Sequence, residues 1–329
     1  MFSNKSILIT GGTGSFGKAF SKYLLKNYEI KRLVIFSRDE LKQFEMQNEE
    51  IFVKYKKNLR FFIGDIRDFD RLNFAFDNID IVIHAAALKQ VLAAEYNPFE
   101  TIKTNIIGAQ NIITAAINKK VKKVIALSTD KACSPINLYG ASKLCSEKLF
   151  INANKYKGKS NILFSVLRYG NVNKSRGSVI PLFKKLAAEK KILPVTDTSM
   201  TRFSIEMKEA LEMVIWGIKN FKGGEILIPK IPSYKLIDLV KALNSDYKII
   251  GSKSGEKLHE DLISESESLK LMVGKKYYII LNDLSDSKLM NYYIGKKFKL
   301  NKKKFVYNSG QNFNFLSISK IKSIIYTND

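Results

Sequence analysis

The stretch Ser6-Ile-Leu-Ile-Thr-Gly-Gly-Thr-Gly-Ser-Phe-Gly17 contains a short apolar run, a glycine-rich turn and the start of a helical segment. Gly11, Gly14 and Gly17 follow the spacing Gly-x-x-Gly-x-x-Gly. Glycines at this spacing allow a tight turn, and they let a pyrophosphate approach the backbone N–H groups at a helix start. The motif alone is weak evidence, but its place between a strand and a helix is the required context. The stretch therefore predicts a dinucleotide site, with a ligand-free glycine turn as the competing interpretation.

Further short apolar runs alternate with helical patterns along the first half of the chain. The runs that predict strands are 6–10, 32–36, 59–63, 79–83, 124–127 and 162–167. Their alternation with helices is typical of an α/β protein with a doubly wound parallel sheet. The pattern changes after Gly170. We expect a dinucleotide-binding domain over 1–170 and a smaller, mainly substrate-binding lobe over 171–329, some segments of which return to the first domain.

Composition limits the class of protein. The chain has 329 residues, 45% of them hydrophobic, which is enough for a sizeable core. Its net charge of +24 fits either an anionic partner or a general lysine bias, and we favour the bias because lysines are scattered along the chain. Two cysteines and two histidines predict neither a disulfide framework nor a metal site. No apolar run approaches the ~20 residues of a membrane span, and no signal peptide is recognisable. We expect a cytoplasmic protein without nucleic-acid or membrane partners.

The end of the second predicted strand bears on cofactor choice. An acidic residue here would hold a ribose 2′-hydroxyl, as in NAD-binding folds. Ser37 and Arg38 occupy this place first, ahead of Asp39. Because an arginine pairs with a 2′-phosphate, NADP is preferred. The alternative is an ordinary surface arginine beside Asp39. Further along, Asp65 is a candidate for the adenine amino group, and His84 is expected to be a buried, hydrogen-bonded histidine.

The stretch 127–143 carries the residues best suited to proton transfer. Tyr139 and Lys143 are four apart, so they share one face of a helix. Asp130 and Lys131 lie in the loop just past the fifth predicted strand. A strand end, a loop and a helix start meet here, where open α/β sheets bind their ligands. From the residues alone, Asp130 and Lys131 fit a charge-paired loop as well as an acid–base pair.

Several stretches together carry a family resemblance. They are Gly11–Gly17, Phe36-Ser-Arg-Asp-Glu-Leu-Lys-Gln-Phe-Glu45, His84-Ala-Ala-Ala-Leu-Lys-Gln90, Ser128-Thr-Asp-Lys131, Tyr139-x-x-x-Lys143, Arg168-Tyr-Gly-Asn171, Ser175-Arg-Gly-Ser178, Met200-Thr-Arg-Phe203 and Gly255-Glu-Lys-Leu-His-Glu260. In this order they resemble the extended short-chain dehydrogenase/reductases, whose dinucleotide-binding domain has the Rossmann fold. More narrowly, they resemble the inverting UDP-N-acetylglucosamine 4,6-dehydratases of pseudaminic acid synthesis. One departure is Gln90-Val-Leu92, where a proline is expected after the valine.

The resemblance implies a lyase that works by internal hydride transfer through NADP. Thr129, Tyr139 and Lys143 match the Ser/Thr, Tyr and Lys of the superfamily, and Tyr139 as phenolate would take the proton of the sugar 4-OH. Lys131, as a neutral amine, would then remove the C5 hydrogen, and Asp130 would protonate the departing 6-OH. Hydride return to C6 and reprotonation at C5 would give UDP-2-acetamido-2,6-dideoxy-β-L-arabino-hexos-4-ulose. Lowering of the tyrosine pKa by nearby positive charge is part of this scheme.

The same resemblance assigns the binding residues and suggests a homo-oligomer, either a dimer or a hexamer. The expected cofactor contacts are Gly11, Thr13, Gly14, Ser15, Phe16, Gly17, Ser37, Arg38, Asp39, Lys42, Asp65, Ile66, Ala85, Ala86, Ala87, Lys89, Asn105, Tyr139, Lys143 and Val172. The expected substrate contacts are Lys89, Thr104, Lys131, Asn171, Arg202 and Glu256.

Two alternatives stand beside this interpretation. A nucleotide-sugar 4-epimerase or NADP-dependent reductase would use the same fold, but it needs only Thr129, Tyr139 and Lys143, so the pair Asp130-Lys131 argues against it. A protein of another class, a non-catalytic regulator that binds nucleotides or RNA, would use the positive charge and bind in a strongly salt-dependent way.

Overall fold

A 10-stranded sheet forms the centre of the computed structural model, which describes residues 2–252 and 254–327. Strand β1 (Ser6–Thr10) pairs in parallel with β2 (Arg32–Ser37) on one side and with β4 (Ile81–His84) on the other. The chain therefore winds outward in both directions from β1. Crevices form where two such halves diverge, at the carboxyl ends of the strands.

The other strands of the parallel region extend this pattern in both directions. They are β3 (Leu59–Ile63), β5 (Lys123–Thr129) and β6 (Leu163–Tyr169). The order β3-β2-β1-β4-β5-β6 is parallel throughout. All five residues of β1 are buried, as expected for a parallel strand covered on both faces. The predicted doubly wound α/β fold is confirmed, with β4 starting two residues later than predicted and β6 ending two residues later.

The C-terminal half extends the sheet in a way that the sequence patterns did not predict. Strand β10 (Ile226–Pro229) adds in parallel to β6, and β15 (Tyr277–Ile280) follows antiparallel to β10. Beyond them lie β14 (Leu271–Val273) and β16 (Lys299–Leu300), also antiparallel. These strands are short, and their pairing depends on the edge presented by β6 rather than on a local pattern.

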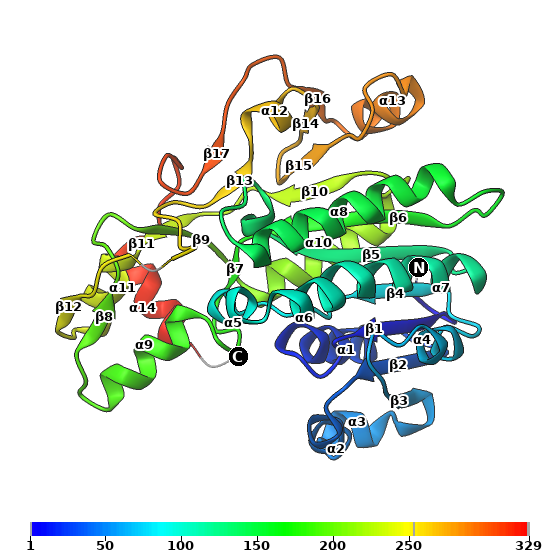
Figure 1. Cartoon of the computed structure of the whole chain (residues 1–329), viewed down its shortest axis with the longest axis horizontal. Coiled ribbons are helices and arrows are strands. Elements are labelled where there is room, and N and C mark those ends of the chain that lie inside the picture. Colours follow the sequence, from blue (N-terminus) through cyan, green and yellow to red (C-terminus); the bar gives the residue numbers. More distant parts are fainter. Residues whose placement is uncertain (1, 253, 328–329) are drawn as a thin grey trace.

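Helices cover the sheet in two layers (Figure 1). In one layer α8 contacts α7, and α7 contacts α4; in the other, α1 contacts α10. The helix bounds in this part of the chain are α1 Ser15–Asn27, α2 Glu40–Gln47, α3 Glu50–Lys54, α4 Phe69–Ala75, α5 Val91–Tyr96, α6 Pro98–Ile102, α7 Gly108–Asn118, α8 Leu138–Tyr156, α10 Met207–Asn220, α12 Glu265–Ser268 and α13 Ser287–Gly295. A π-helical turn over Lys103–Ile107 interrupts the helical run expected from Asn97 through Asn111.

A smaller lobe lies beside the carboxyl ends of the strands and has a hydrophobic cluster of its own (Figure 1). Its helices are α9 Val179–Ala188, α11 Leu236–Leu243 and α14 Ile318–Tyr326, and its strands are β7 Asn171–Val172, β8 Leu193–Val195, β9 Thr201–Ile205, β11 Ser233–Lys235, β12 Tyr247–Ile249, β13 Asp261–Ile263 and β17 Tyr307–Asn308. Helix α9 ends at Ala188, because Lys190 has a positive φ of 53° and Leu193 begins a strand. Among the described residues, no helix combines the length and apolarity needed to cross a membrane.

Candidate active site

A cavity of about 760 Å³ runs along the carboxyl ends of the parallel strands. Open α/β sheets place their ligands in this crevice. The lining from the glycine turn and the β2 tip is Gly11, Thr13, Gly14, Ser15, Phe16, Gly17, Ser37, Arg38, Asp39 and Lys42. Further predicted contacts along the cavity are Asp65, Ile66, Ala85, Ala86, Ala87, Lys89, Thr104, Thr129, Tyr139, Lys143, Asn171 and Val172.

The glycine turn presents bare backbone to this cavity. Gly11 has φ +64°, and a Cβ atom there would lie 2.9 Å from the Cα atom of Ala86. A Cβ atom on Gly17 would lie 2.6 Å from the Cα atom of Gly12. Side chains are therefore excluded where the turn meets the start of α1. This cradle fits the pyrophosphate of a dinucleotide, since the free N–H groups of a helix start favour an anion.

Just after the tip of β2, the carboxylate of Asp39 is already bonded to other protein groups. Asp39 caps α2, because its Oδ1 atom accepts from the backbone N–H of Lys42 at 3.0 Å, and it also pairs with the Lys42 amine. These bonds hold the pKa of Asp39 below its usual value. Ser37 instead directs its hydroxyl to Thr13 Oγ1 at 2.7 Å. The Arg38 side chain is exposed, and its Nη1 atom lies 3.5 Å from Asp65 Oδ2. Its guanidinium therefore remains accessible to a ligand in the cavity.

Asp130 and Lys131, the predicted acid–base pair, lie directly after β5, in a short 3-10 turn over Asp130–Ala132. Asp130 is fully buried, and its Oδ1 atom accepts from Thr129 Oγ1 at 3.0 Å and from Lys131 Nζ at 3.2 Å. Tyr139 lies beside Thr129, and both line the cavity. Thr129 therefore connects the tyrosine, which lines the cavity, to the Asp130–Lys131 pair lying behind it.

A third acidic residue, Glu260, completes this cluster. Its Oε1 atom lies 3.0 Å from Lys131 Nζ and 4.0 Å from Arg202 Nε. Arg202 donates from Nη1 to the carbonyls of Thr201 and Leu258, at 2.7 and 3.1 Å. Lys131 is thus held between two carboxylates, those of Asp130 and Glu260. Sequence reasoning assigned no role to Glu260, although it ends the stretch Gly255-Glu-Lys-Leu-His-Glu260 that carried the resemblance.

The pKa values of this cluster are set by burial and by mutual charge. Burial raises the pKa of Asp130, with Glu260 acting in the same direction and Lys131 opposing it. Burial alone would lower the pKa of Lys131, but the carboxylates of Asp130 and Glu260 together outweigh it, so that pKa is raised. Burial likewise opposes ionisation of Glu260, but Lys131 and Arg202 hold its pKa below the usual value. These neighbouring charges therefore favour the ammonium form of Lys131, which must lose its proton before the amine can act as a base.

Tyr139 and Lys143 are placed one turn apart on α8, both buried. Burial raises the pKa of Tyr139 to about 12, although the Lys131 ammonium acts to lower it. The lowered tyrosine pKa expected from nearby positive charge is therefore not found in the ligand-free protein, where desolvation dominates. Lys143 donates to the carbonyl of Leu127 at 2.8 Å, and burial lowers its pKa to about 8.

The position of the Asp130–Lys131 loop depends on a close approach by α8. A Cβ atom on Gly140 would lie 2.2 Å from the carbonyl oxygen of Lys131, so only glycine permits this packing. Asn137 caps α8 by accepting from Gly140 N, and its amide donates to the Gly255 carbonyl at 2.7 Å. The segment that carries Glu260 is therefore docked onto the same loop and helix start.

Some predicted site residues lie away from the cavity wall. Asn105 is buried, and its side chain bonds with the backbone of Leu88 and with Ser142, so it supports the wall without lining it. Arg202 and Glu256 lie beside Glu260, with Arg202 Nη2 3.6 Å from Glu256 Oε1. His84 is buried and bonds to Thr10 at 2.8 Å, as predicted.

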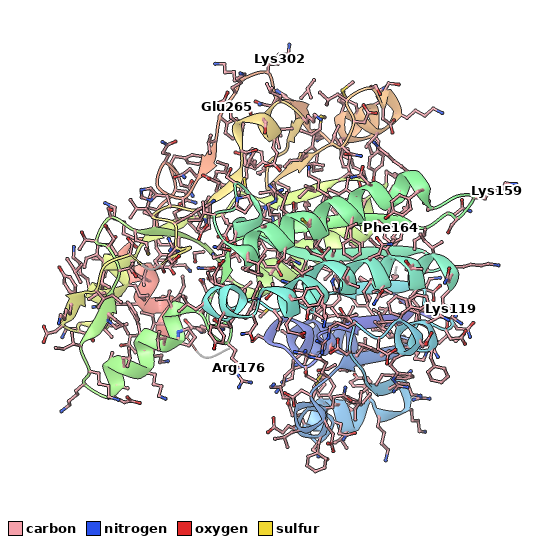
Figure 2. All side chains as sticks on the ribbon, in the orientation of Figure 1. Lys119, Lys159, Phe164, Arg176, Glu265 and Lys302 are labelled. Carbon is pink, nitrogen blue, oxygen red and sulfur yellow. The ribbon has the colours of Figure 1, made fainter. Side chains whose placement is uncertain are left out.

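Sequence reasoning missed Arg176, which lines the cavity from the lobe side (Figure 2). Its backbone N–H donates to Ser15 Oγ at 3.2 Å, and its carbonyl accepts from Lys89 Nζ at 2.7 Å. The segment around Arg176 therefore crosses from the lobe to the glycine turn. Its stretch, Ser175-Arg-Gly-Ser178, was part of the resemblance, but nothing local to it indicates this contact.

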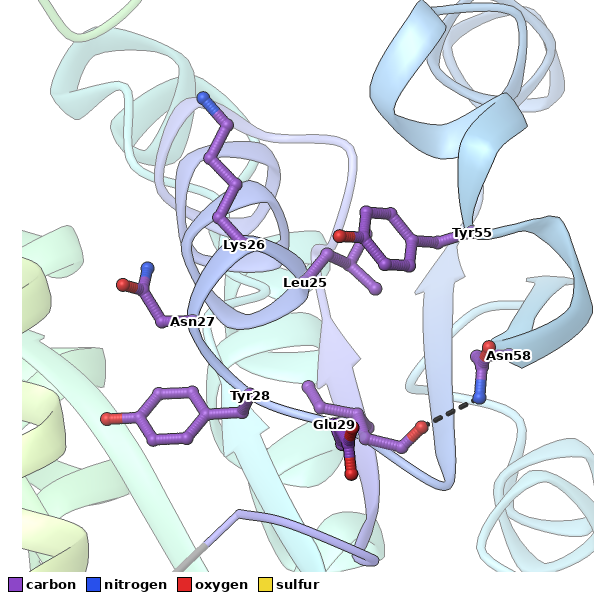
Figure 3. A pocket seen from close by; sticks show the side chains of 8 residues that line it. Leu25, Lys26, Asn27, Tyr28, Glu29, Tyr55 and Asn58 are labelled. Atoms are coloured by element: carbon purple, nitrogen blue, oxygen red, sulfur yellow. Dashed lines mark hydrogen bonds between the residues drawn. The ribbon is translucent and has the colours of Figure 1, made fainter.

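A second hollow, of about 600 Å³, lies at the far end of α1 (Figure 3). Tyr28 and Tyr55 are part of its wall, and Asn58 donates to the carbonyl of Ile30 at 2.8 Å. It contains none of the predicted site residues. We therefore place the candidate active site in the larger cavity at the carboxyl ends of the strands.

Comparison with known proteins agrees with this placement. A family model described as polysaccharide biosynthesis protein matches residues 7–282. The chain belongs to this polysaccharide biosynthesis family, within the extended short-chain dehydrogenase/reductases. Among curated members, the inverting UDP-N-acetylglucosamine 4,6-dehydratase of Campylobacter jejuni is 50% identical, over 99% of this chain and 98% of that protein. The resemblance found in the sequence is therefore confirmed.

Other relatives of this polysaccharide biosynthesis family carry a different activity in their names. A UDP-glucose 4-epimerase of Rickettsia bellii is 43% identical, over 89% of this chain and 88% of that protein. The X-ray structure of Pen from Bacillus thuringiensis superposes with a TM-score of 0.88 at 40% identity, covering 98% of each chain. The relatives thus include proteins named as dehydratases and proteins named as epimerases.

Proposed function

We propose that the protein is an NADP-dependent lyase that removes water from UDP-N-acetylglucosamine and inverts C5, the first step of pseudaminic acid synthesis. The observation that carries the proposal is the cluster of buried Asp130, partly buried Lys131 and buried Tyr139 around Thr129 at the end of β5. A 4-epimerase needs the tyrosine but has no step for a second acid and base. The 50% identity to an inverting dehydratase supports the same choice.

The cofactor is assigned to the cavity from the glycine turn to Lys143. The turn would hold the pyrophosphate, the β2 tip the adenosine ribose, and Tyr139 and Lys143 the nicotinamide half. When bound, the nicotinamide would accept hydrogen from C4 as hydride and return it to C6. We assign NADP because Asp39 is engaged as a helix cap, whereas Arg38 is accessible to a 2′-phosphate.

Tyr139 is proposed to take the proton from the sugar 4-OH. The high pKa of the tyrosine in the ligand-free protein means that it is protonated at rest. A positive charge placed in the cavity would act against desolvation and favour the phenolate. Lys143 is fixed by its bond to Leu127 O and is suited to holding ribose hydroxyls.

Asp130 and Lys131 are proposed to act as the acid and the base in the elimination of water. Asp130 is proposed to donate a proton to the departing 6-OH, and the burial that raises its pKa acts in favour of the protonated form that this role needs. Lys131 is proposed to remove the C5 hydrogen made acidic by the 4-ketone. It must lose its own proton first, which the adjacent Glu260 carboxylate opposes.

The substrate contacts differ in how well the structure supports them. Asn171, Thr104 and Lys89 line the cavity and are retained as proposed contacts of the sugar or its phosphates. Arg202 bonds two backbone carbonyls and faces Glu256 and Glu260, so its guanidinium is already engaged by the protein. We therefore assign Arg202 to the carboxylate cluster in place of the diphosphate. The proposal includes a homo-oligomer that works in the cytoplasm.

The product of the purified protein tests this function directly. Incubation with UDP-N-acetylglucosamine and catalytic NADP⁺ is expected to give a product lighter by one water, with no net reduction of the cofactor. NMR in heavy water is expected to place deuterium at C5. The second candidate, a 4-epimerase, is favoured by the Rickettsia relatives, and it predicts an isomer of unchanged mass. An unchanged mass would exclude the dehydratase.

Arg38→Ala is expected to weaken NADP binding by about 10- to 100-fold and to leave NAD binding unchanged, because a bond to a charged group contributes ~1.5–3 kcal/mol. Calorimetric titration with both cofactors measures the two affinities. Arg60→Ala, which removes an exposed arginine bonded to the carbonyls of Lys57 and Leu59, is the matched control. NAD binding as tightly as NADP to the wild-type protein would contradict the NADP assignment.

A further inference from the structure

Glu260 is the one member of the buried cluster that has no part in the proposed function. Its carboxylate is 2% exposed and lies 3.0 Å from Lys131 Nζ, slightly closer than Asp130 at 3.2 Å. Within the described part of the chain, its second oxygen, Oε2, is buried and accepts no hydrogen bond. A buried acceptor without a partner is costly, which indicates that the position has a purpose other than stability.

We propose that Glu260 is a positioning residue and the internal proton acceptor for Lys131. It holds the Lys131 ammonium at rest, takes its proton when the sugar binds, and returns it after turnover. The inference rests on the proposed function, in which Lys131 must become a free amine. The transfer is balanced: the ammonium and the carboxylate become an amine and a carboxylic acid, and no proton is exchanged with solvent.

Proton counting singles out Glu260 for this task. Asp130 must already carry a proton in order to protonate the 6-OH, so it cannot accept the proton of Lys131. Glu260 is the other carboxylate within 4 Å of Lys131 Nζ among the described residues. After the elimination, Lys131 holds the C5 proton while Asp130 has lost its own. Transfer from Lys131 to Asp130, and from Glu260 to Lys131, returns these three groups to their starting protonation over contacts of 3.2 and 3.0 Å. The proton that C5 regains comes from solvent, and it balances the proton that Tyr139 takes from the 4-OH and releases to solvent.

The local environment sets the direction of transfer. Burial is the largest single influence on Lys131 and on Glu260, and on each it favours the uncharged form. In the ligand-free site, neighbouring charges outweigh burial and keep the ion pair. A sugar that displaces the remaining water would strengthen the burial effect and favour the neutral pair. The other ionisable groups that face the pair are Asp130, Tyr139, Arg202, Tyr234 and Lys257.

The C-terminal segment holds Glu260 at this distance. Ser309 clamps its backbone from both sides: the Glu260 N–H donates to Ser309 Oγ at 2.9 Å, and the Ser309 N–H donates to the Glu260 carbonyl at 2.8 Å. Ser309 Oγ also bonds with Thr201 in β9. The last segment of the chain, whose role was not readable from the sequence, thus contributes to positioning the proposed acceptor.

Glu260→Gln tests the proposal, because it keeps the shape and removes the proton acceptor. We expect kcat at neutral pH to fall by about 10²-fold, the lower range of general acid–base effects. The pH profile is the deciding measurement. With Glu260 present, the proton moves internally and the rate has a pH-independent plateau. In the variant Lys131 must release its proton to solvent, so kcat rises about tenfold per pH unit below the lysine pKa.

Two controls separate this role from a structural one. Asp261→Asn removes the next carboxylate, which pairs with Lys257 and accepts from Asn308, and it is expected to keep the wild-type profile. A loss in Glu260→Gln that is equal at every pH, or no loss at all, would overturn the proposal. If the Gln variant does not fold, Glu260→Asp decides, because its shorter side chain cannot keep the 3.0 Å contact and kcat must fall. Unchanged kcat there refutes the relay.

A measurement without substrate distinguishes failure of this inference from failure of the proposed function. NMR of lysine labelled at Cε, with the Lys131 signal identified by Lys131→Arg, follows the lysine during a pH titration. We expect Lys131 to lose its proton at a clearly lower pH in Glu260→Gln than in the wild type, because a facing carboxylate has been removed. Identical titrations refute the pairing whatever the substrate, whereas an inactive wild type with shifted titrations refutes only the dehydratase assignment.

Discussion

Lys131→Ala is expected to lower the rate of water loss from UDP-N-acetylglucosamine by about 10³-fold, the middle of the range for a general base. The lysine amine is the group proposed to remove the C5 hydrogen. Since Tyr139 and Lys143 are untouched, oxidation at C4 should still occur. The expected result is a protein that forms bound reduced nicotinamide when substrate is added, detected by its ultraviolet absorbance, but releases no dehydrated product.

Two control variants test whether Lys131→Ala affects only the removal of the C5 hydrogen. Lys123→Ala removes another partly buried lysine from the opposite end of β5, where it bonds to the Ile218 carbonyl, and it should keep wild-type activity. Tyr139→Phe should lose both the absorbance change and the product, because it blocks the first proton transfer. Normal water loss in Lys131→Ala would remove the lysine from the mechanism and would require another base at C5.

Arg168→Met is expected to destabilise the fold by about 3–5 kcal/mol, the cost of leaving buried charges without their partner. Arg168 is fully buried at the end of β6. It donates to Glu147 at 3.0 and 2.6 Å, to Glu267 at 2.9 and 2.8 Å, and to the Leu262 carbonyl at 3.0 Å. It thereby joins α8, the sheet and α12. Urea unfolding of the variant measures the loss.

A control for this prediction removes the two carboxylates that Arg168→Met leaves without a partner. Arg168→Met combined with Glu147→Gln and Glu267→Gln should recover part of the lost stability, because no buried carboxylate is left unpaired. Arg60→Ala, at an exposed site, should change stability by less than about 0.5 kcal/mol. A loss in the single variant similar to that of Arg60→Ala would show that the buried network contributes little.

The same network has a defined pH dependence. Burial opposes ionisation of Glu267, but Arg168 lowers its pKa from 4.5 to about 2. A carboxylate with a lowered folded-state pKa adds stability that is fully present above its unfolded pKa and is lost as pH falls through the folded one. The Arg168 contribution should therefore disappear as the pH falls from about 4.5 toward about 2. In Arg168→Met, the acid-dependent change over this interval should be smaller.

Local patterns in the sequence were enough for the first half of the fold and for part of the site. Strand and helix signals depend on residue spacing within a few turns, so β1, β3 and the glycine turn were predicted with their observed bounds. Tyr139 and Lys143 share a helix face for the same reason. The adjacent pair Asp130 and Lys131 needed the family resemblance, because its residues alone also fit a charge-paired loop.

Other features arise only when distant parts of the chain pack together. Glu260 meets Lys131 because Gly255 docks on the cap of α8 and Ser309 clamps the backbone, which no local spacing predicts. Strand β10 joins the sheet only because β6 presents an open edge. Burial is also decided by tertiary packing. The sequence therefore indicated Lys131 as a candidate base, but it could not predict whether the resting lysine carries a proton. Residue identity and spacing determined which ionisable side chains are present. Packing decided which of them lie close enough to set each other's protonation.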